Sequence, residues 1–299
     1  MLRSDNGALP PIPRCSFLRA RDRLGPLSGP ADGTVAGRLA AAVGHPASDA
    51  VAAEALIAVV EGCCAERLGG EMVLIEEPEL LLTPQAQRYL YRLLRRFADD
   101  GNQVVYSTSS VAFVNAARHD EIRRLDLRTA GRLRRTQART LSDAERVRLA
   151  ADFDHERSEM FFARAVVLVE GQTERQSLPL IFRALGHDPD RLGVSIVEVG
   201  GKSNLPPAAR LLDQLGIPFV VVFDADRGAD ATALESKIRQ SAGVAAVIRL
   251  DPDFEAVAGL RSRDDKVLRA WRRFAGTTAS KVPAALATVV NATTRVLDG

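Results

Sequence analysis

The sequence has few cysteines and no long apolar run, and both absences exclude whole classes of protein. Its three cysteines, two of them adjacent at Cys63 and Cys64, form neither a disulfide framework nor a zinc-binding pattern. No apolar run reaches the length of a membrane-spanning helix, and no secretory signal is evident. We therefore expect a cytoplasmic protein that keeps its thiols reduced and has no membrane partner.

The sequence also lacks an excess of charge of either sign. Its 40 Lys and Arg residues balance 38 Asp and Glu residues, so a basic surface can arise only by local segregation of charge. Arginine greatly outnumbers lysine, which suits phosphate contacts and is equally explained by the base composition of the gene. At 299 residues, of which 46% are hydrophobic, the chain can form one or two domains with substantial cores.

Acidic residues follow two short apolar runs in the second half of the chain. The first run, A-V-V-L-V-E-G-Q-T-E-R at 165–175, ends in Glu170, and Glu174 falls in the first turn of the helix that should follow. The second, F-V-V-V-F-D-A-D-R-G at 219–228, ends in Asp224 and Asp226. Such β-branched runs are typical of buried strands in a parallel sheet, and ligands bind where such strands end.

Four carboxylates at one sheet edge repel one another unless a cation lies among them. An oxygen-only ligand set, with no nearby Cys or His, suits Mg²⁺ or Mn²⁺. We therefore interpret Glu170, Asp224 and Asp226 as ligands of one or two metal ions, with Glu174 completing the set. For any one of these acids alone, a helix cap or a surface ion pair would be the simpler explanation.

The same residues carry a resemblance to a known family. The pattern E-G-x-T-E, followed about fifty residues later by D-x-D, resembles a TOPRIM domain, the metal-binding fold of topoisomerases, primases and some nucleases. The wording L-V-E-G-Q-T-E-R-Q-S-L-P, followed by V-G-G-K-S-N-L, is most similar to nucleases of the OLD (overcoming lysogenisation defect) family. In that family the TOPRIM domain follows an ABC-type ATPase, and the resemblance extends from about Val73 onward.

The fold class expected is α/β, with a Rossmann-like parallel sheet and helices on both faces in the TOPRIM half. Strands are expected at about 165–170, 194–199, 218–223 and 246–250, and helices at about 174–186, 204–215 and 231–241. We divide the chain into an irregular segment at 1–35, a partial ABC ATPase-like α/β region at 36–150, a linker at 151–160 and the TOPRIM nuclease domain at 161–299.

Two further stretches of the TOPRIM half belong to the predicted site. After the second strand, Gly200 and Gly201 would let the backbone approach a metal or phosphate, and Lys202 would contact the scissile or an adjacent phosphate. Glu198 has two readings, as an additional weaker metal ligand or as a side chain that points into the helix layer. Lys281, in K-V-P-A-A-L, matches a family lysine near the active site that would stabilise charge on the phosphate, and a surface lysine is the alternative.

The acidic residues after the fourth strand and the single tryptophan leave alternatives open. Asp253 or Glu255, in a stretch similar to the family's L-x-P-D-x-E, is a candidate metal ligand, and helix capping explains Asp251 and Asp253 equally well. Trp271 is expected to lie in the core rather than to act as a platform for base stacking.

The first half of the chain contains one run that resembles a Walker B motif. It is M-V-L-I-E-E-P-E at 72–79, which would place Glu76 at the Mg²⁺ position and Glu77 at the catalytic-base position of a degenerate ATP site. Thr83 and Pro84 predict the start of a helix that runs to about Asp99. The next strand ends in S-T-S-S, where Ser109 replaces the family's γ-phosphate histidine. The segment 44–49, G-H-P-A-S-D, departs from the family's signature motif, and an ordinary capped helix is the expected reading.

No G-x-x-x-x-G-K-[ST] motif occurs, so no loop of this chain would cradle the β- and γ-phosphates of ATP. We predict no ATP hydrolysis by this chain alone, which leaves ATP an uncertain cofactor. The N-terminal half is expected to resemble the trailing part of an ABC ATPase and to act in packing or in dimer formation. A hairpin is expected near Gly131, and its basic run R-L-R-R-T-Q-A-R is read as a solvated face or as a track for a phosphate backbone.

The resemblance and the carboxylates together predict an Mg²⁺- or Mn²⁺-dependent DNA endonuclease. Its partners would be DNA and either a second copy of the chain or a separate ATPase or helicase chain. The alternative is a non-catalytic subunit that binds DNA or a partner ATPase. A topoisomerase is disfavoured because Tyr89, Tyr91 and Tyr106 all lie in the ATPase-like half.

Overall fold

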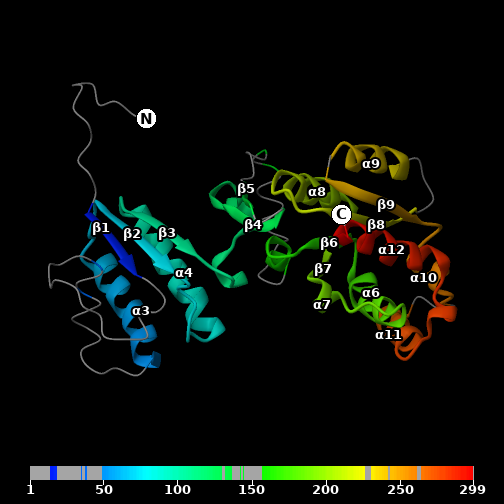
Figure 1. Cartoon of the computed structure of the whole chain (residues 1–299), viewed down its shortest axis with the longest axis horizontal. Helices are drawn as coiled ribbons and strands as arrows, with labels where there is room; N and C mark the ends of the chain where they lie inside the picture. The colour runs from blue at the N-terminus through cyan, green and yellow to red at the C-terminus, as the bar shows by residue number, and fades with distance from the viewer. Residues whose placement is uncertain are drawn as a thin grey trace. The chain divides into compact units, whose positions relative to one another are not determined.

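A computed structural model describes two compact units, Met1–Phe113 and Val114–Gly299, and each unit is considered by itself (Figure 1). The described residues are 14–18, 35, 38, 49–129, 132–136, 142, 144, 157–225, 230–241, 243–260 and 264–298. Within these ranges, no helix combines the length and the apolar character needed to cross a membrane.

The first unit contains a three-stranded parallel sheet in the order β1-β2-β3. Its strands are β1 (Arg14–Leu18), β2 (Glu71–Glu76) and β3 (Gln103–Ser107). The central strand β2 buries Val73 and Ile75, which explains its apolar sequence. We expected residues 1–35 to be irregular, and β1 corrects this in part. Its five residues gain stability by pairing with β2 at the sheet edge, which their short local pattern does not reveal.

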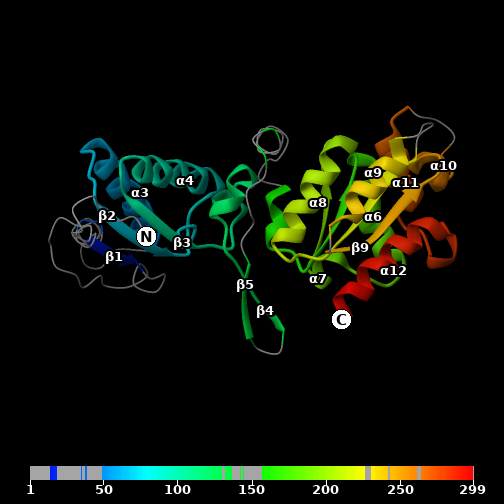
Figure 2. The same cartoon turned by 90° about the horizontal axis from the view of Figure 1, so that it is seen from above.

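Two helices pack on one face of this sheet (Figure 2). They are α3 (Asp49–Ala65) and α4 (Pro84–Asp99), followed by the short η1 (Val111–Phe113). The predicted start of α4 is confirmed, since the Thr83 hydroxyl caps the helix by accepting from the Ala86 amide at 3.4 Å. Residues 44–48 of the altered signature segment lie outside the described residues.

Near its start, the second unit has a β-hairpin that forms hydrogen bonds with later residues of the same unit. After η2 (Ala116–Glu121), β4 (Arg124–Thr129) pairs antiparallel with β5 (Arg132–Thr136), and η3 (Arg157–Phe161) follows later. Arg124 donates to the carbonyls of Phe161 and Ala163, at 3.3 and 3.1 Å, and the Thr136 hydroxyl donates to the Leu215 carbonyl at 2.8 Å. These bonds explain why the two units divide at Phe113/Val114, whereas we had placed the linker at 151–160.

The main sheet of the second unit is parallel throughout, with the order β7-β6-β8-β9. Its strands are β6 (Ala165–Val169), β7 (Val194–Glu198), β8 (Phe219–Asp224) and β9 (Val244–Leu250). Their positions confirm the predicted α/β alternation, with bounds that differ by up to two residues from those expected. The apolar runs of β6 and β8 are explained by their central places, since both faces of these strands are covered.

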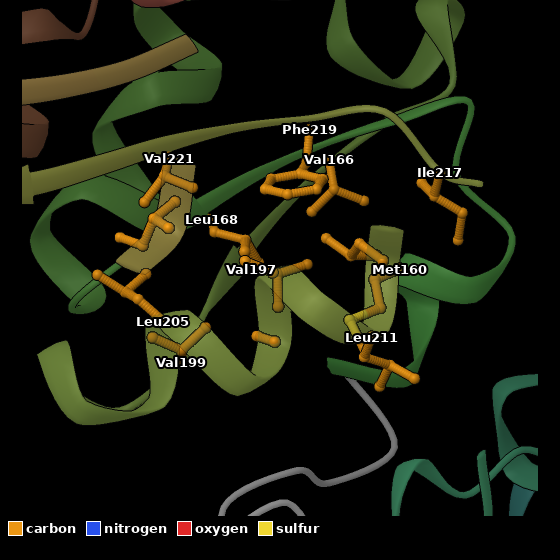
Figure 3. Packing of buried hydrophobic residues seen from close by; sticks show 14 of the residues in the cluster. Met160, Val166, Leu168, Val197, Val199, Leu205, Leu211, Ile217, Phe219 and Val221 are labelled. Carbon is orange, nitrogen blue, oxygen red and sulfur yellow. The ribbon is translucent and has the colours of Figure 1, made fainter. Parts of the chain in front are cut away.

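Helices cover both faces of this sheet, as expected. They are α6 (Gln172–Ala184), α7 (Pro189–Leu192), η4 (Lys202–Asn204), α8 (Leu205–Gln214), α9 (Asp230–Arg239), α10 (Phe254–Ala258), α11 (Lys266–Phe274), η5 (Ala279–Lys281) and α12 (Ala284–Asp298). Strand alternation divides the side chains of β6 between two cores. Val166 and Leu168 pack with α8 residues such as Leu205 and Leu211 (Figure 3), whereas Val167 and Val169 pack with the α6 and α12 side.

Candidate active site at the sheet edge

The first two acidic side chains of the site follow adjacent strands. Glu170 comes directly after β6, and Asp224 is the last residue of β8, which is the parallel neighbour of β6. Because parallel strands end at the same edge, the two residues meet there: Oε1 of Glu170 accepts a hydrogen bond from the backbone amide of Asp224 at 2.7 Å. The structure therefore brings together Glu170 and Asp224, which the sequence indicated as metal ligands.

Asp224 also positions the segment after the fourth strand. Its Oδ1 accepts a hydrogen bond from the backbone amide of Phe254 at 2.8 Å, at the start of α10. The amide of Ala225 donates to the Leu250 carbonyl at 2.7 Å. Through these two bonds, the end of β8 holds the start of α10, whose Glu255 is buried.

Glu174 is the buried carboxyl of the site. It lies in the first turn of α6 and is only 5% exposed. Burial, the largest cause, and the negative charges of Asp224, Glu170 and Glu255 together raise the pKa of this carboxyl from its ordinary value of 4.5 to about 8, against a hydrogen bond from its own backbone amide. Glu174, Asp224, Glu170 and Glu255 therefore form one electrostatically coupled group, which we call the carboxylate cluster.

Two lysines form ion pairs with the carboxylate cluster. Nζ of Lys202 lies 3.7 Å from Oε1 of Glu170, and Nζ of Lys266 lies 3.2 Å from Oε1 of Glu255. The hydrogen bond to Glu255 raises the pKa of Lys266, and the charges of Glu174 and Asp224 contribute to the rise. Lys266 was not predicted from the sequence, because it belongs to no motif. The chain has only four lysines, and this rarity was the one feature that could have marked Lys266 as a candidate.

The glycines before Lys202 are required by the backbone. Gly200 and Gly201 have φ values of 73° and 118°, in the region that favours glycine. The Gly201 amide donates to the Glu170 carbonyl at 3.1 Å, and the Asn204 side chain donates to the Val199 carbonyl at 2.8 Å. The loop is thus fixed against the end of β6, and this placement brings Lys202 to Glu170.

Two acidic residues near the site have contacts that bear on their alternative readings. Glu198 pairs with Arg157, whose Nη2 lies 3.8 Å from Glu198 Oε1 and whose Nε donates to the Glu198 carbonyl at 2.7 Å. Oδ1 of Asp253 accepts from the Ala256 amide at 2.8 Å and so caps α10. The contacts of Glu198 and Asp253 are therefore those of an ion pair and a helix cap.

Three other predicted positions are not joined to the carboxylate cluster by described contacts. Asp226 lies outside the described residues. Lys281 is exposed at the end of η5, and its carbonyl accepts a hydrogen bond from Arg273 at 3.0 Å. Trp271 was expected in the core, and this prediction was wrong because the side chain is 48% exposed. Its helix α11 buries Ala270 and Phe274 instead.

The donor set of the cluster fits a hard divalent cation. No three His, Cys, Asp or Glu side chains of the described residues form a ready-made metal site. Asp226 is not one of the described residues. The available donors are nevertheless carboxylate oxygens, which Mg²⁺ and Mn²⁺ prefer. A cation between Glu170, Glu174 and Asp224 would offset the repulsion that raises the pKa of Glu174.

The Walker B-like acids in the first unit are held by hydroxyl and amide groups. Glu76 ends β2 and is exposed. Oε1 of the buried Glu79 accepts from the Thr108 hydroxyl at 2.8 Å and from the Ser109 amide at 2.7 Å. The Ser109 hydroxyl donates to Glu77 at 3.3 Å. Burial, and then a hydrogen bond to Glu79, raise the pKa of Glu77. The sequence reasoning gave no role to Glu79.

Comparisons with known proteins point to one family. The family model described as "Overcoming lysogenization defect protein-like, TOPRIM domain" matches residues 161–226. The OLD nuclease of Thermus scotoductus is 34% identical over 230 residues, covering 68% of this chain and 43% of that protein. The Old nuclease of Escherichia phage P2 is 27% identical over 161 residues, covering 52% of this chain and 28% of that protein. The chain thus spans less than half the length of these curated relatives.

Solved structures similar to this chain include the C-terminal region of the Burkholderia pseudomallei OLD protein. It shares 20% sequence identity, with a TM-score of 0.38, over 46% of this chain and 99% of that one. The C-terminal region of the Xanthomonas campestris pv. campestris OLD protein, phased with platinum, shares 23% identity, with a TM-score of 0.36, over 47% of this chain and 96% of that one.

Proposed function

Since this chain carries a TOPRIM domain of the OLD-like family at residues 161–226, we propose that it is a metal-dependent DNA endonuclease. One observation carries the proposal. The buried carboxyl of Glu174 lies among the negative charges of Glu170, Asp224 and Glu255, at the edge where parallel strands end. Carboxyl groups whose pKa is raised strongly by burial and by neighbouring negative charges are found mainly at functional sites.

Glu170, Glu174 and Asp224, together with Asp226, would hold Mg²⁺ or Mn²⁺ through their carboxylate oxygens. When bound, such an ion lowers the pKa of water and stabilises negative charge on a phosphate. In this proposal Glu170 and Asp224 keep their positions through the hydrogen bond between them, so the ligand atoms are fixed by the sheet edge.

The lysines near the site would act on the phosphate backbone of DNA. Lys202 lies beside Glu170 on a loop that the glycine conformations and the Gly201 hydrogen bond hold in place. We assign to it a contact with the scissile or an adjacent phosphate. Lys281 is assigned the stabilisation of charge on the phosphate, as its match to the family lysine implies. Both amines would attract an anionic substrate towards an otherwise acidic edge.

For the first unit we propose a structural role without ATP hydrolysis by this chain alone. Glu79 uses one carboxylate oxygen to hold the backbone at Ser109, and Ser109 occupies the position where the family has histidine. Together with the lack of a phosphate-cradling loop in the sequence, this supports a unit that packs against a second copy or against a separate ATPase chain.

The test is nicking of supercoiled plasmid DNA with Mg²⁺ or Mn²⁺, compared with EDTA. Glu170→Gln keeps an oxygen that can accept from the Asp224 amide and removes the charge, so the fold should survive. We expect at least about a 100-fold loss of nicking, given that even supporting groups around a metal contribute about 10- to 100-fold. Glu77→Gln removes a charge in the other unit and should leave nicking unchanged. Full activity of Glu170→Gln, or equal activity in EDTA, would contradict the proposal.

A further inference from the structure

A pocket of about 740 Å³ lies beside the carboxylate cluster and opens to solvent. Its lining residues are Gln176 of α6, Asp265 directly before α11, and Lys266, Val267, Leu268 and Trp271 of α11. The helices α6 and α11 lie side by side (Figure 1). The pocket adjoins the proposed active site through Lys266, which forms the ion pair with Glu255.

The pocket presents apolar surface that the core does not use. Trp271 is 48% exposed and Leu268 is 44% exposed, whereas Ala270 and Phe274 of the same helix are buried. Because Ala270 and Phe274 anchor α11, the fold does not need Trp271 for its core. An exposed indole provides a flat surface on which an unpaired base can stack, whatever its sequence.

The positive charge of α11 complements the negative charge of a nucleic-acid strand. The helix reads K-V-L-R-A-W-R-R-F, with four basic residues and no acidic one in nine positions. Asp265, directly before the helix, is the acidic residue of the pocket lining. Clustered basic residues with an exposed aromatic side chain are the pattern of a surface that binds single-stranded nucleic acid.

We propose that this pocket holds one unpaired nucleotide of the substrate strand, next to the phosphate that is cleaved. The base stacks on Trp271, and Lys266 contacts the nucleotide's phosphate. In a duplex each base is stacked on its own neighbours, so a protein ring gains access only to a base that is unpaired or flipped out. The inference rests on the proposed nuclease function and defines its substrate class as a strand with an unpaired base at the cut.

The chain's single tryptophan reports on this pocket directly. The full chain is titrated in EDTA, where the strand is not cut, with a short single-stranded oligodeoxythymidine and with an abasic strand of equal length. We expect a saturable change in tryptophan fluorescence with oligodeoxythymidine, and a much smaller change with the abasic strand. No binding of oligodeoxythymidine at low salt, or binding that leaves the emission unchanged, overturns the inference.

Substitutions separate stacking from charge, with binding followed by anisotropy of a labelled oligodeoxythymidine. Trp271→Ala should weaken binding roughly tenfold to a hundredfold, and Trp271→Phe less. Phe162→Ala is the matched control, because Phe162 is also exposed (40%) but precedes β6, at the opposite edge of the sheet.

Lys266→Gln tests the contribution of charge. It should reduce the salt dependence of oligodeoxythymidine binding by about the amount expected for one phosphate contact. Arg272→Gln removes the same charge from α11 outside the pocket lining. It should leave unchanged the difference in affinity between oligodeoxythymidine and the abasic strand.

Cleavage assays distinguish failure of this inference from failure of the proposed function. If the wild type cuts DNA and Trp271→Ala cuts single-stranded and duplex substrates equally well, the pocket inference is wrong and the nuclease stands. If the wild type cuts nothing but its tryptophan responds to oligodeoxythymidine, the nucleotide site is supported and the nuclease proposal fails. We expect Trp271→Ala to lose cleavage activity, with the greatest loss on single-stranded substrate.

Discussion

Both units place acidic residues where a buried parallel strand ends, yet the contacts of these residues differ. In the first unit, Glu79 and Glu77 after β2 accept hydrogen bonds from the Thr108 and Ser109 groups that follow β3. In the second unit, Glu170 and Asp224 lie near the buried Glu174, and Lys202 pairs with Glu170. In the first unit, neutral donors bridge two loops, and Glu77 also contacts Glu79. In the second unit, four carboxyl groups and two lysines gather at one sheet edge.

This difference shows that an acidic residue at the end of a strand identifies where the residue lies in the sheet. It does not by itself identify the chemical role of that residue. Glu79 satisfies one carboxylate oxygen with the backbone and side chain of a neighbouring loop, and this holds the loop in place. Glu174 instead lies where burial and three like charges oppose its ionisation. We propose that the second arrangement binds a cation, whereas the first holds a loop of the fold.

The largest effect should come from Glu174. With its folded-state pKa near 8 and an ordinary value of 4.5, the metal-free folded chain binds a proton that the unfolded chain has lost between these values. The contribution of Glu174 to stability is therefore complete below about pH 4.5 and is lost as the pH rises through about 8, by up to roughly 5 kcal/mol. Urea unfolding in EDTA across this range measures the loss.

Glu174→Gln is the control for this effect, because an amide remains neutral at every pH. In EDTA the stability of the variant should fall less than that of the wild type as the pH rises. Mg²⁺ should stabilise the wild type more at high pH, where the carboxylate is charged, than at low pH. Parallel stability curves for the wild type and the variant would contradict the assignment.

An intermediate effect is expected from Glu79 in the first unit. Glu79→Ala leaves the Ser109 amide and the Thr108 hydroxyl without their acceptor and should destabilise the chain by about 2 kcal/mol, measured by urea unfolding. Glu79→Gln keeps an acceptor oxygen and should cost less. Plasmid nicking should be the same in both variants, because the interaction supports the fold. A loss of nicking without a loss of stability would remove the contrast between the two units.

A smaller effect should come from Lys202, which we propose to contact a phosphate. Lys202→Gln should reduce nicking about tenfold. Its free energy of unfolding should change by less than about 1 kcal/mol, because the pair with Glu170 is partly exposed. Lys237→Gln removes the same charge from the exposed side of α9 and should leave nicking unchanged. Equal nicking by the two variants would rule out a special role for Lys202.

Much of the fold could be predicted from local sequence, because the strands of the second unit are buried on both faces. Their β-branched runs differ from the helical stretches between them, and parallel connections follow from the alternation. The strand β1 was missed because its stability comes from pairing with β2. The division of the chain was placed differently because the contacts of Arg124 and Thr136 join residues far apart in sequence.

The site was predictable only in part, for a similar reason. The meeting of Glu170 and Asp224 follows from adjacent parallel strands, and the position of Glu174 from the first turn of a helix. The contact of Lys266 with Glu255 depends on how α11 packs, and no local pattern shows it. The exposure of Trp271 was also missed, because Ala270 and Phe274 take the buried positions of that helix.

The central claim, that the acids after β6 and β8 hold a divalent cation, is tested most directly by Mn²⁺ binding. Electron paramagnetic resonance measures free Mn²⁺ as the full chain is titrated, without any substrate. Asp224→Asn keeps an oxygen that can accept from the Phe254 amide and removes the charge, and Glu77→Gln is the control from the first unit. We predict saturable binding by the wild type and by Glu77→Gln, and strongly weakened binding by Asp224→Asn. Undiminished binding by Asp224→Asn would contradict the account.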